Sequence, residues 1–123
     1  MNKRVLVIED QPDNRQILRD LLGSVGIEVL EAHNGAEGVR MAGETRPDLI
    51  LMDIQMPEMD GYQATRSIKA DPDTASIPVI VVTSYALSGD ETKGREAGCD
   101  GYVTKPFSPR ALLAMVQEHL NQG

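Results

Sequence analysis

The stretch Leu49-Ile50-Leu51-Met52-Asp53 is a wholly apolar run that ends on a carboxylate. Pro47-Asp48 precedes it and Gln55-Met56-Pro57 follows it, which limits the run to the length of a strand. A short run that is apolar at every position is typical of a strand buried on both faces of a parallel sheet. Asp53 would then emerge at the carboxyl edge, where open α/β sheets bind their ligands. Taken alone, Asp53 has a second interpretation, as a residue that caps the following turn.

Four further segments have the composition of strands, and helical patterns separate them. These segments are Val5–Ile8, Ile27–Ala32, Val79–Val82 and Tyr102–Val103. Regular alternation of strands and helices with short connections predicts βαβ units wound into one parallel sheet, an α/β fold of five strand-helix units. Glu28 and Glu31 interrupt the apolar pattern of Ile27–Ala32, so we place this strand at an edge of the sheet.

Five helices are expected, and the fourth, which is weakly apolar, should be the loosest. We expect them from Pro12 to about Gly23, after Asn34, from Tyr62 to Ala70, from Ser88 to Ala97, and from Pro109 onward with Ser108 as the cap. The first should pack through Ile17, Leu18, Leu21, Leu22 and Val25. The second should pack through Ala36, Val39 and Ala42, with Asn34 and Glu37 in a capping-box arrangement.

The composition describes one ordinary globular domain, which we expect to span residues 1–123. Apolar residues make up 41% of the chain and charged residues 25%. The formal charge of −7, without a cluster of Lys and Arg, argues against a nucleic-acid partner. No apolar run approaches the ~20 residues that span a bilayer, and no signal peptide is recognisable, so we expect a cytoplasmic protein without a membrane partner.

The cysteine and the histidines do not suggest a site of their own. Cys99 is the only cysteine, which excludes an internal disulfide and suits a reducing compartment. Because it follows Gly98, we interpret it as a small packed side chain rather than a nucleophile. His33 and His119 lie far apart without ligand-like spacing, so a zinc site is not expected.

Polar residues stand at the ends of four predicted strands. They are the carboxylates Glu9-Asp10 and Asp53, the hydroxyl of Thr83 and the amine of Lys105. Two unit charges ~5 Å apart at an effective dielectric near 20 repel by about 3 kcal/mol, so three clustered acids need compensation. Mg²⁺ supplies it, because this ion prefers a few carboxylates together with waters and a phosphate oxygen. An ionised Asp beside such a metal is a known nucleophile that forms an acyl phosphate.

Each of these residues also has an ordinary interpretation. Glu9-Asp10 could cap the first helix, Thr83 could simply end its strand, and Lys105 could be a solvated amine. The regular alternation of the chain nevertheless carries all of them to the same edge of the same sheet. This convergence favours a phosphoryl-accepting site over the separate interpretations.

The whole chain resembles the receiver domain of bacterial two-component response regulators, the family of CheY. The matching motifs are Glu9-Asp10 after the first strand, Asp53 in Met52-Asp53-Ile54-Gln55-Met56-Pro57, Thr83 in Val82-Thr83-Ser84, and Lys105-Pro106 after Tyr102. As a set at these intervals they are highly specific. The resemblance implies a flavodoxin-like (βα)5 three-layer sandwich with a parallel sheet of order 2-1-3-4-5. This order agrees with the edge position given to Ile27–Ala32.

The resemblance also implies a chemistry. Asp53 would accept a phosphoryl group from a histidine kinase or a histidine phosphotransfer protein. Glu9, Asp10, Asp53 and the backbone carbonyl of Gln55 would hold Mg²⁺. The domain would catalyse only its own phosphorylation and dephosphorylation, and it would signal by phosphorylation-dependent protein binding.

Three other residues receive roles from the same resemblance. Thr83 and Lys105 would bind the phosphoryl oxygens, and Thr83 with Tyr102 would form the switch. A cis Lys105–Pro106 peptide would aim Lys105 back at Asp53. The downstream protein would bind the face made by the fourth helix, the fifth strand and the fifth helix, and Met1 directly before the first strand favours a self-standing regulator.

The sequence departs from the common family pattern near the site. Glu9 stands where Asp is usual, which leaves open direct metal contact or contact through water. Ser84 and Tyr85 border the site and would affect the lifetime of the phosphate.

The sequence fits the rival functions less well. A phosphatase of the haloacid dehalogenase type needs an acid where Gln55 stands. A flavodoxin needs a Ser/Thr/Gly-rich loop in place of Glu9-Asp10-Gln11-Pro12, and the intact Asp53, Thr83 and Lys105 speak against an unphosphorylated scaffold.

Overall fold

The computed structural model describes residues 3–54, 56, 59–83, 97–104 and 107–121, excluding the side chain of Thr83. The five strands are β1 (Arg4–Ile8), β2 (Glu28–Ala32), β3 (Leu49–Asp53), β4 (Val79–Thr83) and β5 (Gly101–Thr104). They form one parallel sheet in the order β2-β1-β3-β4-β5. The predicted order and the edge position of β2 are therefore confirmed.

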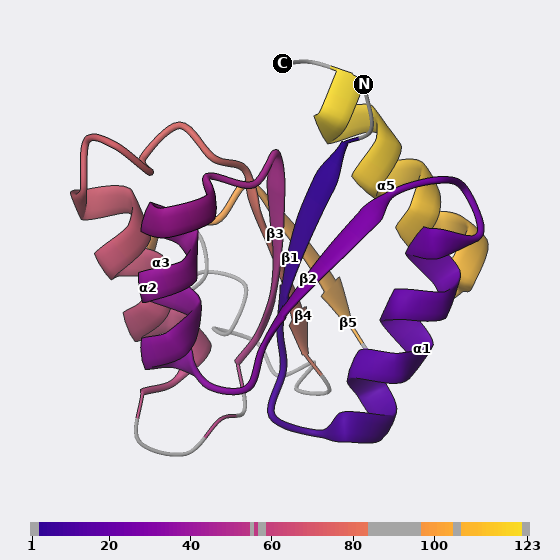
Figure 1. The fold of residues 1–123 in the computed structure, drawn as a ribbon, viewed down its shortest axis with the longest axis horizontal. Helices are drawn as coiled ribbons and strands as arrows, with labels where there is room; N and C mark the ends of the chain where they lie inside the picture. Colours follow the sequence, from indigo (N-terminus) through magenta and orange to yellow (C-terminus); the bar gives the residue numbers. More distant parts are fainter. Residues whose placement is uncertain (1–2, 55, 57–58, 84–96, 105–106, 122–123) are drawn as a thin grey trace.

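Four helices in the described part of the chain cover both faces of the sheet (Figure 1). They are α1 (Pro12–Gly23), α2 (Gly35–Thr45), α3 (Gly61–Ala70) and α5 (Pro109–Asn121). α1 and α5 lie on one face, and α2 and α3 lie on the other. The fourth predicted helix, from Ser88 to Ala97, lies outside the described residues except for Ala97. The result is the predicted three-layer α/β sandwich.

In the described part of the chain, the alternating side chains of the strands contribute to two large hydrophobic cores, one on each face of the sheet. Leu6 and Ile8 of β1 point toward α2 and α3, whereas Val5 and Val7 point toward α1 and α5. β3 is buried at all five positions, as its uninterrupted apolar sequence predicted. Because both faces of this central strand are covered, its carboxyl end is held firmly at the edge of the sheet.

The packing face of α1 is narrower than predicted. Leu18 and Leu22 are buried, but Ile17 is 55% exposed and Val25 is 44% exposed. Consecutive residues of an α-helix lie about 100° apart, so Ile17 turns away from the face that Leu18 presents to the sheet. Val25 lies beyond the last residue of the helix. The prediction for these two residues was wrong.

The packing face of α2 is shifted from the predicted one. Gly35, Gly38 and Ala42 are buried, whereas Ala36 is exposed. A Cβ atom at Gly38 would overlap the side chain of Ile8, so this glycine is required for close packing on β1. The Asn34 side chain accepts a hydrogen bond from Glu37 N at 2.8 Å, as predicted, but the Glu37 carboxylate accepts from His33 N at 3.1 Å. The reciprocal bond of a capping box is therefore displaced by one residue.

Lys69 joins three segments near the amino edge of the sheet. Its Nζ donates to the carbonyl oxygens of Ala75 and Ile77 at 3.1 and 2.7 Å, and to Asp100 Oδ2 at 2.9 Å. Asp100 Oδ2 also accepts from Val79 N at 2.8 Å. One ammonium group therefore holds the end of α3 to the loop before β4 and to the turn before β5.

Lys69→Met should lower the free energy of unfolding by about 2 kcal/mol, because it removes three hydrogen bonds while keeping the apolar stem. The figure allows for the exposure of Asp100, whose side chain is 39% exposed. Urea denaturation measures the change. Arg40→Met is the control, since the Arg40–Glu44 pair is 59% and 57% exposed and should contribute less than about 0.5 kcal/mol. Equal losses in both variants would contradict the assignment.

Candidate functional site

The carboxyl edge of the sheet carries three acidic side chains. Asp53 ends β3 and is only 6% exposed, while Glu9 directly follows β1 and is 1% exposed. One carboxylate oxygen from each of Glu9, Asp10 and Asp53 can be chosen so that all three lie within 4.8 Å of one another. The structure thus brings together the three carboxylates that the sequence placed at one edge.

Glu9 is held by its backbone as well as by its side chain. Its N–H donates to the carbonyl of Ala32 at 3.1 Å, and its own carbonyl accepts from Arg15 Nη1 at 2.8 Å. Its Oε2 accepts from Gln11 N at 3.3 Å. Gln11 is the N-cap residue of α1 and has no side-chain cap bond. The longer Glu side chain therefore supports the first turn of α1 while also belonging to the acidic cluster.

The donor set of this acidic cluster fits Mg²⁺. Carboxylate oxygens are the hard ligands that this ion prefers, and a few of them suffice because waters complete its octahedron. Apolar residues line a cavity of about 10 Å³ beside Glu9 and Asp53: Ile8, Leu18, Leu51 and Val82. Low-polarity surroundings strengthen the repulsion between ionised carboxylates, and a bound cation would offset it.

The loop that follows Asp53 is fixed by α3. Ile54 O accepts hydrogen bonds from Met56 N at 3.0 Å and from Gly61 N at 3.1 Å. Asp60 caps α3 in a complete capping box with Gln63. This Asp-x-x-Gln spacing, which our sequence analysis overlooked, predicts a cap. A Cβ atom at Gly61 would lie 2.8 Å from Ile54 Cα and 3.0 Å from Asp53 C, so α3 starts directly against the backbone of the site.

The remaining predicted site residues are placed only in part. β3 and β4 pair Asp53 with Val82, so Thr83 lies one residue further along β4, and Thr104 pairs with Thr83 at the end of β5. The side chain of Thr83 and all of Gln55, Lys105 and Pro106 lie outside the described part of the chain. Their roles, and the cis peptide between Lys105 and Pro106, stay predictions.

Tyr102 lies in β5 beside a small cluster that starts at the site. The ring of this half-buried residue packs against a group made of Ile54, Tyr62, Val81 and Ala97. Ile54 directly follows Asp53, and Ala97 stands at the end of the predicted fourth helix. The residue that follows Asp53 and the predicted switch residue Tyr102 therefore meet in one hydrophobic cluster.

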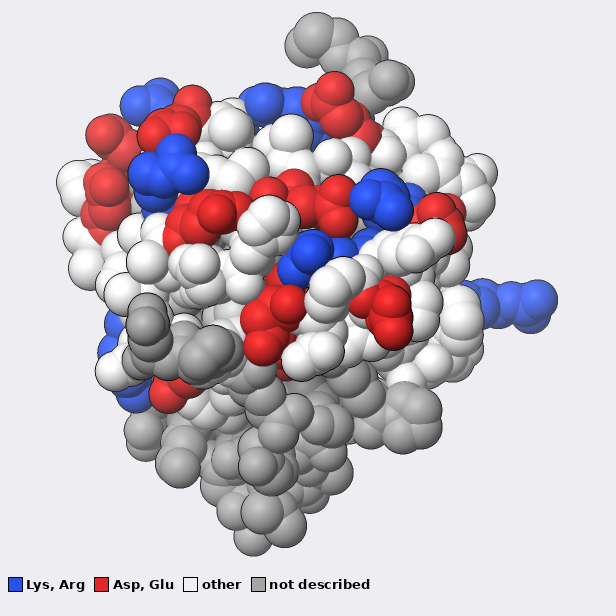
Figure 2. Space-filling view, turned by 60° about the horizontal axis from the view of Figure 1, so that its bottom comes forward, with Lys and Arg blue, Asp and Glu red and all other residues white. Residues whose placement is uncertain are grey.

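Figure 2 turns the carboxyl edge of the sheet toward the viewer. Acidic and basic side chains lie interspersed over the coloured part of this face. Near this edge, Glu31 of β2 pairs with two arginines of α1: its Oε1 lies 3.7 Å from Arg15 Nε, and its Oε2 lies 3.1 Å from Arg19 Nη1. Arg15 and Arg19 are thus both engaged with one acid of β2.

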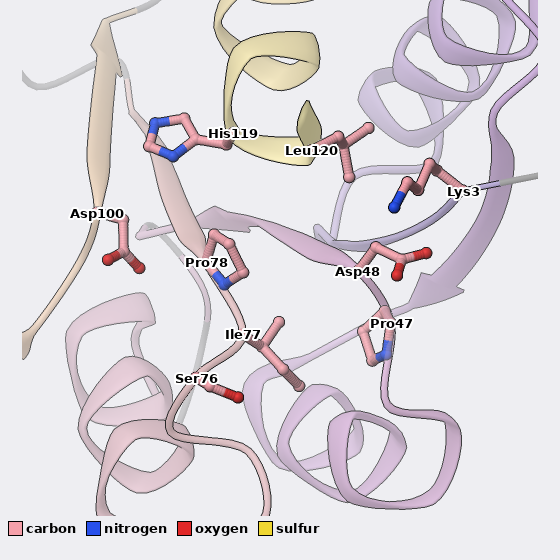
Figure 3. A pocket seen from close by; sticks show the side chains of 9 residues that line it. All are labelled: Lys3, Pro47, Asp48, Ser76, Ile77, Pro78, Asp100, His119 and Leu120. Atoms are coloured by element: carbon pink, nitrogen blue, oxygen red, sulfur yellow. The ribbon is translucent and has the colours of Figure 1, made fainter. Parts of the chain in front are cut away.

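A larger pocket of about 460 Å³ lies at the opposite, amino edge of the sheet (Figure 3). Residues that precede β1, β3, β4 and β5 line it, together with His119 and Leu120 of α5. Its carboxylates already serve the backbone: Asp48 Oδ2 accepts from Arg4 N at 2.8 Å, and Asp100 Oδ2 binds Val79 N and Lys69. The two carboxylates of this pocket therefore have structural roles, and the acidic cluster at the carboxyl edge is the candidate functional site.

A parallel sheet of the order β2-β1-β3-β4-β5 with three acids at its carboxyl edge defines an α/β domain of the flavodoxin-like class. The family model for the response regulator receiver domain matches residues 5–117. The chain therefore belongs to the response regulator receiver domain family, and it is a signalling domain of two-component systems. In the described residues, none of the helices has both the length and the apolar character needed to cross a membrane.

Response regulators of this family are similar to the chain over their whole length. The polar-differentiation response regulators DivK of Brucella anthropi and Brucella ovis are 42% and 40% identical to this chain, with complete coverage of both partners. Among solved structures, the receiver domain of the sensor histidine kinase PA1611 from Pseudomonas aeruginosa is 36% identical, with a TM-score of 0.91 over 98% of this chain and 99% of that one. That structure has a magnesium ion coordinated in its active site cleft. The Vibrio cholerae chemotaxis protein CheY4 is 28% identical, with a TM-score of 0.90 over 96% and 98% of the two chains.

Proposed function

We propose that residues 1–123 form a receiver domain that accepts a phosphoryl group on Asp53 from a histidine kinase or a histidine phosphotransfer protein. The observation that carries this proposal is the convergence of Glu9, Asp10 and Asp53 within 4.8 Å at the carboxyl edge of the sheet. Asp53 is the natural acceptor because it ends the central strand, where the covered sheet holds it in place. A kinase of this kind draws its phosphoryl group from ATP, so we propose a cytoplasmic location.

Mg²⁺ is the proposed cofactor, held by Glu9, Asp10, Asp53 and the backbone carbonyl of Gln55. The magnesium ion in the related PA1611 domain supports this assignment. When bound, the ion neutralises the carboxylates and polarises the phosphoryl oxygens. Without it, the acidic cluster would repel an incoming phosphate dianion.

The proposed reaction is an in-line phosphoryl transfer. An ionised carboxylate oxygen of Asp53 attacks the phosphorus of a phosphohistidine, a P–O bond forms, and the P–N bond breaks. The electron pair of the broken bond returns to the imidazole nitrogen of the donor. In the later dephosphorylation, water attacks the phosphorus, a new P–O bond forms, the P–O bond to Asp53 breaks and frees its carboxylate, and a proton of the attacking water passes to solvent. Thr83 and Lys105 would contact the phosphoryl oxygens in both steps.

Acetyl phosphate tests this proposal without a known kinase. We expect one phosphoryl group per chain in Mg²⁺, none in excess EDTA, and trapping by borohydride at Asp53 in a peptide map. Modification elsewhere in the chain, or equal modification in EDTA, would overturn the assignment.

Signalling would pass from Asp53 through Thr83 and Tyr102 to the face made by the fourth helix, β5 and α5. A phosphoryl dianion on Asp53 would attract the Thr83 hydroxyl as a charge-assisted donor. Tyr102 would then move further inward against the cluster that contains Ile54. Because a ligand only redistributes existing states, the free domain should sample this inward state as a minority.

Thr83→Ala and Tyr102→Ala should each remove most of the response of α5 to beryllium fluoride, a mimic of the phosphoryl group. The double variant should lose little more than either single variant, because both residues act in one switch. The measurement is the change in amide NMR signals of α5 on adding beryllium fluoride and Mg²⁺. Strictly additive losses would show that the two side chains act independently.

A further inference from the structure

Arg15 connects the loop after β1 to the edge strand β2. Its Nη1 donates to the backbone carbonyl of Glu9 at 2.8 Å, and its Nε lies 3.7 Å from Glu31 Oε1. The Arg15 side chain is only 14% exposed, so this guanidinium is largely shielded from water. Charge-assisted hydrogen bonds of this kind are roughly twice as strong as neutral ones.

The bond to Glu9 acts on the peptide that joins Glu9 to Asp10. The Glu9 carbonyl and the N and Cα atoms of Asp10 lie in one peptide plane. A bond that fixes the carbonyl therefore also fixes the position of Asp10 Cα. The preceding N–H of Glu9 is fixed by Ala32, the neighbour of Glu31 in β2. The N–H and the carbonyl of Glu9 are thus both held by the end of β2. The N–H bonds Ala32 directly, and the carbonyl is linked to Glu31 through Arg15.

We infer that Arg15 is a positioning residue of the metal site, which orients Glu9 and Asp10 through the Glu9 carbonyl and uses Glu31 as its anchor. This inference rests on the proposed function, because it assigns Arg15 to the Mg²⁺ site described above. Arg15 would touch neither the ion nor the phosphoryl group. Residues that orient metal ligands in this way commonly contribute about ten- to a hundredfold to metal affinity.

The direction of the change in Mg²⁺ affinity distinguishes a positioning role of Arg15 from an effect of its charge alone. A positive charge near the acidic cluster opposes the binding of a cation, so loss of the Arg15 charge alone would make Mg²⁺ bind more tightly. Loss of positioning would make Mg²⁺ bind more weakly. The two explanations therefore predict opposite changes for Arg15→Met.

Isothermal titration calorimetry with MgCl₂ on the full chain measures this affinity directly. We expect about tenfold weaker binding in Arg15→Met and an intermediate loss in Arg15→Lys, which keeps the charge but not the fork of donors. Arg19→Met is the matched control, because Arg19 also pairs with Glu31, at 3.1 Å, but its side chain is 50% exposed and its described bond reaches Glu31 alone. This control should bind Mg²⁺ within about twofold of the wild type. Phosphorylation of Arg15→Met by acetyl phosphate should recover at saturating Mg²⁺.

Each outcome decides a different statement. Equal or tighter Mg²⁺ binding in a folded Arg15→Met would overturn the positioning role and leave the proposed function intact. Absence of Mg²⁺ binding in the wild type would overturn the proposed function, and the inference with it. Urea denaturation in EDTA reports whether Arg15→Met is folded; if it is not, Arg15→Lys decides, and unchanged affinity in that variant rejects the inference.

Discussion

Asp53→Asn should reduce Mg²⁺-dependent phosphorylation by acetyl phosphate at least a thousandfold, to the level of the background. The amide is nearly isosteric with the carboxylate but offers no ionised oxygen to attack phosphorus, and loss of a covalent nucleophile commonly costs about 10³-fold or more. Asp53 is 6% exposed and lies in the cluster with Glu9 and Asp10. The variant also removes one of three mutually repelling charges, so its free energy of unfolding in EDTA should equal or exceed that of the wild type.

Asp48→Asn is the matched control for this variant. Asp48 precedes the first residue of β3 and Asp53 is the last, so the two acids stand at opposite edges of the sheet on the same strand. The Oδ2 of Asp48 accepts from Arg4 N at 2.8 Å, and an Asn carbonyl can accept the same bond. This control should be phosphorylated at the wild-type rate. Phosphorylation of Asp53→Asn at more than a few per cent of the wild-type rate would place the acceptor elsewhere.

The strands and the acidic cluster were predictable from the sequence because both depend on local pattern. Leu49–Asp53 is apolar at every position, and the structure buries every position. The glutamates of β2 likewise indicated an edge strand, and among the described strands β2 pairs with β1 alone. Once these strands run parallel, Glu9, Asp10 and Asp53 must reach the same edge.

The helix faces were less predictable because a helix can turn about its axis by one residue without changing its apolar content. Ile17 fits an apolar stripe as well as Leu18 does, but the position of the sheet selects Leu18. In α2 the closest contact is made by Gly38, which has no side chain to appear in a hydrophobic pattern. The requirement for glycine there comes from Ile8, a residue 30 positions earlier in the chain.

The supports of the site were also hidden from sequence reasoning. No pattern in the sequence indicates the hydrogen bond that Arg15 donates to the Glu9 carbonyl. In the sequence, Gly61 is typical of a turn after Asp60. Only the structure shows that its Cα lies against the backbone of Asp53 and Ile54. Every residue has a backbone carbonyl, so the type of the residue that accepts such a contact does not indicate it. A pattern of side chains therefore cannot predict contacts with the backbone.

Gly61→Ala should lower the free energy of unfolding by about 2–3 kcal/mol and slow the phosphorylation of Asp53. The backbone angles of Gly61 are open to any residue, so the requirement is for space. An added Cβ atom would overlap the carbonyl oxygen of Asp53 and lie 2.8 Å from Ile54 Cα. These are backbone atoms, which cannot turn aside as the end of a flexible side chain can. Relief of the overlap must move either the start of α3 or the end of β3, and the second movement displaces the phosphoryl acceptor.

Gly43→Ala supplies the comparison within the same protein. Gly43 lies inside α2, and a Cβ atom there would meet no neighbouring atom within 4 Å. Its replacement should raise the free energy of unfolding by about 0.5–1 kcal/mol, since Ala loses less conformational entropy than Gly in a helix. Urea denaturation and the rate with acetyl phosphate at saturating Mg²⁺ should be measured for both variants. If Gly61→Ala loses stability but its folded molecules react at the wild-type rate, the overlap is absorbed by α3 alone. If it loses neither, the close approach of α3 to Asp53 has no bearing on the site.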